Sequence, residues 1–272
     1  MASILENRSL TGLSLALEAN LIGQVRYYGQ SPIIKVFDEH KMVRVVSGVP
    51  VSIFNLIAGA QLEETNIEYQ IEEALEPFNR YQVPMIWWVG PMTTPKELGT
   101  HLETQGLAKI FDMPGMYYEL ASLEHQLQLP PHFRFEHVTS DDLLRVWAET
   151  QTKAFGVASS ETQMIYEFEK SLGVRREAPW LRYIGFCNEE PVGVSILFFH
   201  AGVAAIFNVA TIPEYRRQGI GQLMTKIPLF RARRLGYKFG VLKASKMGQH
   251  LYSSMDFAEI CKISYYYYDP RG

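Results

Sequence analysis

The sequence is poor in the residues that mark metal sites and disulfide frameworks. Its 272 residues include two cysteines, Cys187 and Cys261, which lie far apart and form no CxxC pair and no Cys/His cluster. This scarcity argues against a zinc site and against a disulfide framework. We therefore expect two buried thiols and no metal cofactor.

An excess of charge and long apolar runs are also missing. The net charge of −3 gives no global electrostatic reason to bind nucleic acid or an anionic membrane. Glu6, Arg8 and Glu18 interrupt the N-terminal apolar residues, and no span of about 20 apolar residues occurs elsewhere. Leucines at helical spacing from Leu10 to Leu21 predict a helix instead. We expect no signal peptide and a cytoplasmic protein.

What the chain does contain is two patterned halves. Apolar residues make up 47% of it and charged residues 20%, which is typical of globular proteins, and the length suits two domains. A polar stretch ending in Pro130-Pro131 separates the halves. The expected division is a domain over 1–122, a linker over 123–131 and a second domain over 132–272.

The C-terminal half predicts a mixed α/β layer. Strands are predicted from apolar, β-branched and aromatic runs at 134–138, 180–187, 192–200, 203–210, 239–243, 258–263 and 265–268. Helices are predicted at 142–155, 161–172, 219–235 and 247–255, the first capped by Ser140 or Asp141. An antiparallel meander therefore precedes alternating helices and strands.

The N-terminal half repeats part of this order. The string Ile53-Phe54-Asn55 recurs as Ile206-Phe207-Asn208, and we interpret both as strands. An apolar strand follows each, at 85–89 and 239–242, and a helix follows that strand. Three coincidences in the same order predict a duplicated fold.

The segment most informative about function runs from Val209 to Gly221, where a strand leads into a loop that opens a helix. Gly219 and Gly221 lack a Cβ, so the backbone can approach an anion while unpaired N–H groups at the helix start point at it. Arg216 and Arg217 add positive charge, and the helix dipole acts in the same direction. The spacing fits neither a Walker loop nor the dinucleotide fingerprint. Gly-x-Gly alone favours a turn that needs small residues for packing, whereas the wider pattern, with its arginines and the preceding run of antiparallel strands, favours a pyrophosphate site.

Arg-x-x-Gly-x-Gly after such a strand resembles the signature of the GCN5-related N-acetyltransferases (GNAT), whose loop binds the pyrophosphate of acetyl-CoA. The segment 244–257 is similar to that family's second motif, a helix with Leu-Tyr followed by Gly-Phe. Both motifs fall within about the last 140 residues. The resemblance implies an α/β fold of two tandem acyl-CoA N-acyltransferase-like (GNAT) domains, with the second domain active and acetyl-CoA as co-substrate.

The resemblance also assigns the cofactor contacts. They fall on Val209, Ala210, Thr211, Arg216, Arg217, Gln218, Gly219, Ile220, Gly221, Gln222 and Ser245. Three residues depart from the family pattern: Asp256 replaces the usual glycine, Ser245 stands where asparagine is frequent, and Pro228 lies inside the pyrophosphate helix, where we expect a kink. Aspartate can adopt the left-handed conformation of a helix-ending glycine, so the fold should survive that change.

Acetyl transfer to an amine needs a group that protonates the leaving sulfur. Tyr252 falls where the family places this general acid, and the alternative is a core tyrosine that packs its helix on the sheet. The proton acceptor is harder to identify, because the strand 203–209 contains no carboxylate. His200, or a water held by Asn208, are the candidates.

Several other residues have two interpretations each. Glu161 and Glu136 are weaker candidates for the base, and His200 could be a solvated surface residue. Arg231, Arg233 and Arg234 either solvate a helix end or reach the cofactor's 3′-phosphate. Trp87 and Trp88 point to opposite faces of a strand, one into the core and the other against a neighbouring domain or the acceptor pocket. Tyr265–Tyr268 alternate faces, so two should pack and two should face solvent or a partner.

The N-terminal half is predicted to lack a cofactor loop. The segment after Asn55 offers one glycine, no arginine, and the carboxylates of Glu63 and Glu64 where phosphates would lie. Leu102 stands where the second motif would place its tyrosine. We expect an N-acetyltransferase that modifies a small-molecule amine, an amino acid or a peptide, as a monomer or homodimer. The alternative is a non-catalytic acyl-CoA-binding or regulatory protein, because the strand carboxylate is missing.

Overall fold

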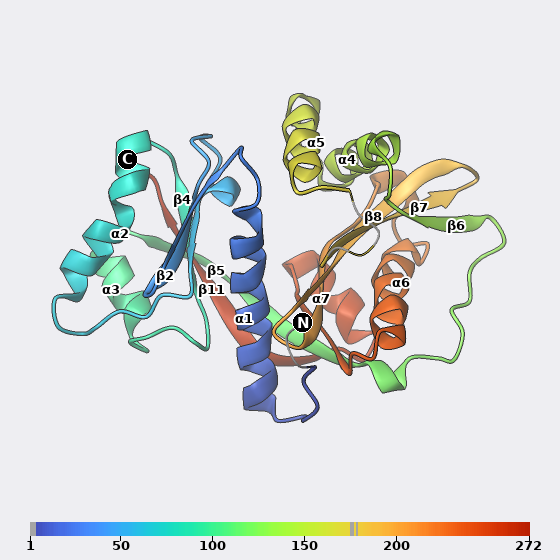
Figure 1. Ribbon diagram of the computed structural model, residues 1–272, viewed down its shortest axis with the longest axis horizontal. Coiled ribbons are helices and arrows are strands. Elements are labelled where there is room, and N and C mark those ends of the chain that lie inside the picture. The colour runs from blue at the N-terminus through green and yellow to red at the C-terminus, as the bar shows by residue number, and fades with distance from the viewer. Residues whose placement is uncertain (1–3, 175–176, 178) are drawn as a thin grey trace. The chain divides into compact units, whose positions relative to one another are not determined.

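The computed structural model describes residues 4–174, 177 and 179–272, and contacts group the chain into two compact units. Unit 1 comprises Met1–Arg8 and Met116–Ala258, and unit 2 comprises Ser9–Gly115 and Glu259–Gly272 (Figure 1). These boundaries differ from those expected at 122 and 131, because the last strand groups with the N-terminal unit. No described helix is long and apolar enough to span a membrane.

Unit 1 is built on a mixed sheet with the order β5-β10-β9-β8-β7-β6. Its strands are β6 Phe133–His137, β7 Trp180–Cys187, β8 Glu190–His200, β9 Val203–Thr211, β10 Phe239–Lys243 and the end of β5, Ala108–Glu119. Strands β6 to β9 form the expected antiparallel meander, whereas β9 and β10 run parallel. The parallel pair is what brings the ends of two strands, and the helices that follow them, to one edge of the sheet.

Four helices cover this sheet. They are α4 Asp141–Phe155, α5 Thr162–Ser171, α6 Ile220–Arg234 and α7 Lys246–Ser253. The predicted cap of α4 is Ser140, whose Oγ accepts a hydrogen bond from the N–H of Leu143 at 3.2 Å. Single-turn helices η2 Leu120–Ser122, η3 Ser159–Glu161 and η4 Pro213–Tyr215 lie in the connections.

The helices divide between the two faces of the sheet. Helix α6 lies on the face of Gly193, where an added Cβ would come within 3.0 Å of both Ile220 and Met224. The opposite face carries Phe198, because side chains alternate along β8. The Trp180 ring packs against Phe198 with centroids 5.6 Å apart, and its indole N–H donates to Glu169 of α5. Helices α4 and α5 therefore cover the face away from α6.

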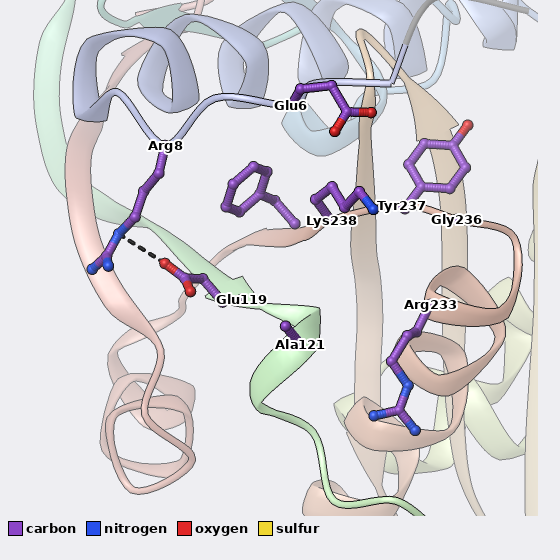
Figure 2. Close-up of a pocket in the computed structure, with 9 residues that line it drawn as sticks. Glu6, Arg8, Glu119, Ala121, Arg233, Gly236, Tyr237 and Lys238 are labelled. Atoms are coloured by element: carbon purple, nitrogen blue, oxygen red, sulfur yellow. Dashed lines mark ion pairs between the residues drawn. The ribbon is translucent and has the colours of Figure 1, made fainter.

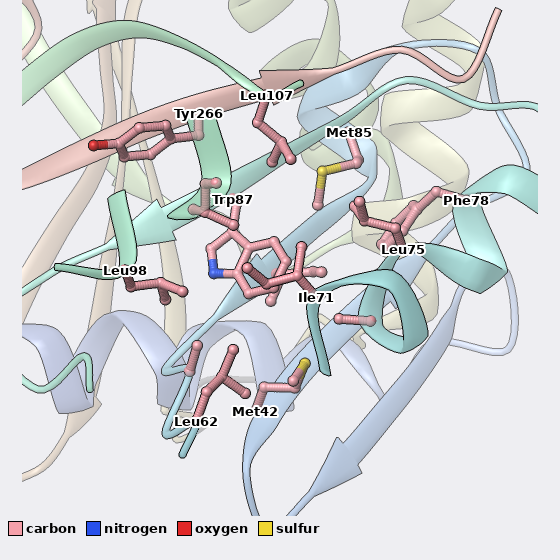
Figure 3. Packing of buried hydrophobic residues seen from close by; sticks show 14 of the residues in the cluster. Met42, Leu62, Ile71, Leu75, Phe78, Met85, Trp87, Leu98, Leu107 and Tyr266 are labelled. Atoms are coloured by element: carbon pink, nitrogen blue, oxygen red, sulfur yellow. The ribbon is translucent and has the colours of Figure 1, made fainter. Parts of the chain in front are cut away.

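Unit 2 has the sheet order β1-β2-β3-β4-β11-β5. Its elements are α1 Leu10–Tyr28, β1 Lys35–Glu39, β2 Met42–Val46, η1 Ser52–Phe54, β3 Leu56–Ala58, α2 Ile67–Tyr81, β4 Met85–Val89, α3 Leu98–Thr104, the first part of β5, and β11 Ala258–Tyr268. Figure 3 shows its core, in which the fully buried Trp87 packs among Ile71, Leu98 and their neighbours. Trp88 is half-buried, so one indole of the pair lies in the core, as predicted.

The order of elements is the same in both units. Elements β3-α2-β4-α3 of unit 2 correspond to β9-α6-β10-α7 of unit 1, and each set contains a parallel strand pair. The strands that come next are exchanged: β11, which follows α7, pairs with β4, and β5, which follows α3, lies beside β10. The duplicated fold is confirmed, with a strand contributed to each unit by the other half of the sequence.

Four local predictions were wrong. Ile53-Phe54-Asn55 is not a strand, because η1 ends at Phe54 and the buried Asn55 side chain accepts from the N–H of Ser47 and donates to the carbonyl of Val49, which folds the chain into a turn. The two final strands are one, β11. Tyr265 and Tyr266 are both buried, so both strand faces are covered there. Cys187 and Cys261 are half-buried, since they lie in strands whose neighbours leave part of the thiol exposed.

Candidate active site

The loop between β9 and α6 leaves an open helix start. Gly219 is the N-cap of α6, with φ 79° and ψ −4°, and no described side chain caps this helix. The backbone N–H groups of the first turn therefore lack an intrahelical partner. An added Cβ on Gly219 would meet no described atom within 4 Å. The geometry fits an anion, because free N–H groups and the positive end of the helix dipole face open space.

The two arginines of this loop have different surroundings. Arg216 is tied to backbone carbonyls, donating from Nη2 to Ala154 at 2.8 Å and from Nε to Thr211 at 3.2 Å, and so braces the loop against the end of α4. Arg217 is exposed and has a φ of 65°, an unusual backbone conformation for a side chain of its size. Gln218 donates to the carbonyl of Glu214. Arg217 is therefore the cation best placed to meet a phosphate.

Gly221 has a packing role that the sequence did not indicate. A Cβ on Gly221 would lie 3.1 Å from Leu251 of α7. The glycine therefore allows α7 to approach the first turn of α6. The Gly221 N–H still belongs to the open first turn, together with those of Ile220 and Gln222. Helix α6 continues through Pro228 without ending there.

Helix α7 carries the candidate acid. Its N-cap is Ser245, whose Oγ accepts from the N–H of Gly248 at 3.1 Å. The Tyr252 ring lies over Gly248, where an added Cβ would come 2.9 Å from Cε2, so the ring points back toward the start of the helix. Burial raises the pKa of Tyr252 to about 12, so the phenol keeps its proton at neutral pH. Asp256 follows with φ 64°, the left-handed conformation expected of it.

Strand β9 contains a bulge at Asn208. Ile196 pairs with Phe207 and Val194 pairs with Ala210, so two residues of β9 lie opposite one residue of β8. Asn208 has φ 51°, and its Nδ2 donates to Oε1 of Gln151 in α4 at 3.2 Å. Bulges re-aim side chains and release backbone groups from the ladder. This one turns Asn208 toward the face that α4 covers.

The residues of both sequence motifs meet at one edge of unit 1. The β9–β10 pairing joins Ala204 to Gly240 and Ala205 to Val241, and both strands run on beyond it. Since the strands are parallel, the loop after β9 and the start of α7 after β10 lie at the same edge. The contact between Gly221 and Leu251 joins the two helix starts directly. Tyr252, Ser245, Asn208 and the loop 211–221 are thus brought together.

Other predicted residues lie elsewhere. His200 is exposed and pairs with Val203, at the opposite end of β9 from Asn208. Five residues of strand, about 17 Å, separate these ends, so the structure does not bring His200 to the site. Glu136 lies on β6, three strands from β9, beside Arg134. Glu161 lies in η3, at the start of α5.

The arginines at the end of α6 are also remote from the loop. Arg233 donates from Nη1 to the carbonyl of Leu123 at 2.8 Å and from Nη2 to that of Glu124. It therefore fastens the helix end to the segment after β5. Helix α6 has 15 residues, so about 20 Å separates this cluster from the anion site. The alternative in which Arg231, Arg233 or Arg234 reaches the 3′-phosphate is not supported.

A separate pocket of about 410 Å³ lies at this far end of α6. Figure 2 shows Arg8 paired with Glu119 on one side and Arg233 on the other, with Tyr237 and Lys238 between the strand start and the helix end. None of the motif residues lines it. The pocket therefore belongs to the opposite end of unit 1 from the candidate active site.

Sequence reasoning missed two residues at the site edge. Gln151 follows Leu144, Trp147 and Ala148 at helical spacing on the apolar face of α4, and nothing in the sequence connects it to Asn208. Lys243 ends the otherwise apolar strand β10 and directly precedes Ala244 and Ser245. Burial lowers the pKa of this lysine to about 7, although part of its side chain reaches the surface. A charged residue that closes an apolar run at the carboxyl edge of a sheet was the signal that could have identified it.

The corresponding loop of unit 2 is filled by a side chain. Gln70 of α2 is buried and donates from Nε2 to the carbonyl of Glu63 at 2.9 Å and to Oδ1 of Asn66 at 2.9 Å. Its amide occupies the inside of the turn that precedes the helix. Leu102, the counterpart of Tyr252, is fully buried in the core. In this unit Gln70 therefore holds the loop before the helix, and a buried leucine stands in place of the proton donor.

Comparison with known proteins agrees with this geometry. Residues 180–259 match the protein family described as acetyltransferase (GNAT) domain. No curated protein matches the sequence significantly. A solved GCN5-related N-acetyltransferase from Kribbella flavida has a TM-score of 0.71 at 17% identity, covering 93% of this chain and 96% of that one.

Two further solved structures extend the likeness over both units. A tandem GNAT protein from the clavulanic acid biosynthesis pathway has a TM-score of 0.66 at 9% identity, over 96% of this chain and 94% of its own. A GCN5-related N-acetyltransferase from Sphaerobacter thermophilus has a TM-score of 0.61 at 15% identity, over 99% and 95%. These likenesses show the fold, and the predicted class of two tandem GNAT-like domains is confirmed.

Proposed function

We propose that this chain, which carries a GNAT acetyltransferase domain at residues 180–259 and so has an acyltransferase fold, transfers the acetyl group of acetyl-CoA to an amine. The observation that carries the proposal is the joint placement of an uncapped helix start and a buried, protonated tyrosine at one sheet edge. The first fits the pyrophosphate of the donor, and the second fits its leaving thiol.

The residues of unit 1 suit acetyl-CoA. The pyrophosphate would lie against the N–H groups of Gly219, Ile220, Gly221 and Gln222, with Arg217 beside it and Arg216 holding the loop in place. Val209, Ala210 and Thr211 lie in β9 beyond its pairing with β10, so their backbone groups would be available to the amides of the donor's extended arm. Ser245 would contribute at the start of α7.

The reaction itself needs two proton transfers. Tyr252 would protonate the sulfur as the C–S bond breaks, since its raised pKa keeps the phenol protonated at the moment of transfer. Asn208 would orient the incoming amine or a water, because Gln151 occupies its Nδ2 and fixes which way the amide points. The acceptor would be a small-molecule amine, an amino acid or a peptide.

Unit 2 would contribute no second cofactor site. Its loop is closed by Gln70, and its first helical turn carries Glu68, which disfavours phosphate. The chain would therefore bind one acetyl-CoA. The domain limits 1–122 and 132–272 remain our proposal for the two sequence repeats, in which the final strand belongs by sequence to the second.

Steady-state thiol release with a panel of amines tests this function. We expect saturable release of CoA that depends on both acetyl-CoA and one class of amine. The absence of a carboxylate on β9 favours a second candidate, a non-catalytic acyl-CoA-binding or regulatory protein. Binding of acetyl-CoA without turnover on any amine of the panel would support that second candidate.

A further inference from the structure

The proposed reaction requires a base that the GNAT-like strand does not supply. Strand β9 presents Ala205 and Phe207 on the face that α4 and α5 cover, and it has no carboxylate in Val203–Thr211. As a neutral amine attacks the thioester its nitrogen becomes positively charged, so the step needs a group that removes a proton. His200 lies at the wrong end of β9 to do this.

We propose that Lys243 is the catalytic base, taking the proton from the attacking amine. This inference rests on the proposed function of the same site. Lys243 is the last residue of β10. The parallel register pairs Gly240 with Ala204 and Val241 with Ala205, and continuing it by two residues puts Lys243 level with Phe207, next to the bulge.

The direction of the lysine follows from the alternation of β10. A Cβ on Gly240 would lie 2.4 Å from Leu229 of α6, so Gly240 and Leu242 face α6, whereas Val241 and Lys243 face the other side. Asn208 reaches Gln151 of α4 on that same side. The lysine and the bulge asparagine therefore share one face at one edge.

The acid lies at the same place. Helix α7 begins three residues after Lys243, and the Tyr252 ring points back over Gly248 toward that start. Tyr252 and Lys243 thus lie on the two elements that the Ala244-Ser245 turn joins. The proposal places the base and the acid on either side of the reacting carbon, as acyl transfer to an amine needs.

Burial shifts the pKa values of Lys243 and Tyr252 in the directions that a base and an acid need. Lys243 ends a strand of otherwise apolar residues, and burial lowers the pKa of Lys243 to about 7. Near neutral pH a large fraction of the lysine is then uncharged and able to accept a proton. Tyr252, with its raised pKa, stays protonated over the same range.

Other titratable groups near this edge fit the role less well. The carboxylate of Glu214 is exposed and pairs with Lys153 at 3.3 Å, and its own backbone N–H and that lysine hold the pKa of Glu214 below its usual range. His250 precedes Tyr252 by two residues, which places it on the opposite side of α7. The amides of Asn208 and Gln151 do not accept protons at neutral pH.

The proposed step balances. The nitrogen lone pair of the amine forms the new C–N bond, and the C–S bond breaks with its electron pair on sulfur. The Nζ lone pair of Lys243 takes one proton from the amine nitrogen, and the Tyr252 hydroxyl gives one proton to the sulfur. Lys243 then returns its proton to solvent through its exposed portion, and Tyr252 recovers one, so the products are the N-acetyl amide and free thiol.

The test compares the wild type with Lys243→Met and Lys243→Arg, with Lys238→Met as control at the exposed far end of β10. We expect wild-type kcat to rise with pH through an apparent pKa near 7. Lys243→Met should lower kcat about 10²-fold or more and remove this rise of kcat with pH. Lys243→Arg should not restore it, because arginine keeps the charge but cannot lose its proton. Acetyl-CoA affinity should be unchanged in all variants.

The possible outcomes distinguish a failure of the base role of Lys243 from a failure of the proposed function. A wild type that releases no thiol with any amine would refute the proposed function and the base role with it. An active wild type whose Lys243→Met variant keeps its kcat and its acidic limb, or whose Lys243→Arg variant is fully active, would refute the base role alone. Side-chain NMR of lysine-labelled protein, assigned from the spectrum of Lys243→Met, adds a check without turnover: a Lys243 that titrates near the ordinary lysine value of 10.5 contradicts the assignment.

Discussion

At the residue scale, burial acts in opposite directions on the two ionisable groups of the candidate site. It raises the pKa of Tyr252 to about 12 and lowers that of Lys243 to about 7. In both cases the low-dielectric surroundings favour the uncharged form. The uncharged forms, a phenol and an amine, are the ones that a proton donor and a proton acceptor need.

Replacement of Tyr252 by phenylalanine tests the donor. The ring packs over Gly248 and against Phe257, so the loss of a hydroxyl should leave the fold intact. We expect kcat to fall about 10²–10⁴-fold with little change in acetyl-CoA affinity. An unchanged kcat, measured where chemistry limits the rate, would make Tyr252 a structural residue.

The lowered pKa of Lys243 also predicts a pH dependence of stability. The unfolded lysine titrates near 10.5 and the folded one near 7, so the folded state is disfavoured below about pH 7 and gains stability as pH rises toward 10. Lys243→Met removes this contribution. The free energy of unfolding of the wild type, minus that of the variant, should therefore be larger at high pH than at low pH. Urea unfolding at about pH 6.5 and about pH 9.5 measures it, and an equal difference at both would contradict the shift.

At the scale of elements, the anion site is the start of α6, and Arg217 tests it. The structure makes Gly221 a poor probe, because any side chain there meets Leu251. Arg217→Glu instead reverses a charge at an exposed position beside the open helix start. We expect acetyl-CoA affinity to weaken roughly tenfold or more, and the thermal shift it causes to shrink.

Arg234→Glu is the matched control for this change. It reverses the same charge at the exposed far end of the same helix. Its acetyl-CoA binding should stay close to that of the wild type. Equal losses in the two variants would indicate a general charge effect and not an anion site at the loop.

The attachment of α5 to the sheet depends on a buried ion pair. Glu169 accepts hydrogen bonds from Arg182 Nε at 2.6 Å and from the Trp180 indole at 3.0 Å, and both charged side chains are almost fully buried. Glu169→Gln leaves the arginine charge without its partner, which typically costs about 3–5 kcal/mol. We expect a large drop in Tm. Glu189→Gln, the same substitution in the exposed pair with Arg134, should change Tm little, and equal drops would contradict the assigned role.

The sequence predicted elements better than connections. Apolar periodicity and caps located α4, α6 and β10 to within about two residues, because those signals are local. The sequence-based prediction failed at Ile53-Phe54-Asn55. The same three residues form part of strand β9, but here they form a turn that the Asn55 side chain holds. Lys243 and Gln151 were missed because their roles depend on which strands and helices lie side by side, and no local pattern records that.

At the scale of the whole molecule, two copies of one order of elements have diverged in opposite directions. Unit 1 has the exposed Arg217 beside its helix start and a tyrosine on α7, whereas unit 2 holds its loop with Gln70 and has Leu102 in place of the tyrosine. The exchange of β5 and β11 makes each unit depend on the other half of the sequence for a strand. The domain limits inferred from composition could not show this, because strand pairing is not local.

Calorimetric titration of the intact chain with acetyl-CoA measures how many donor sites the chain has. We expect one site per chain, which Arg217→Glu weakens and which Lys238→Met leaves unchanged. We expect no second site in unit 2, since Gln70 holds its loop and the carboxylate of Glu68 in the first turn of α2 disfavours a phosphate. Two acetyl-CoA molecules per chain, or none, would contradict the account.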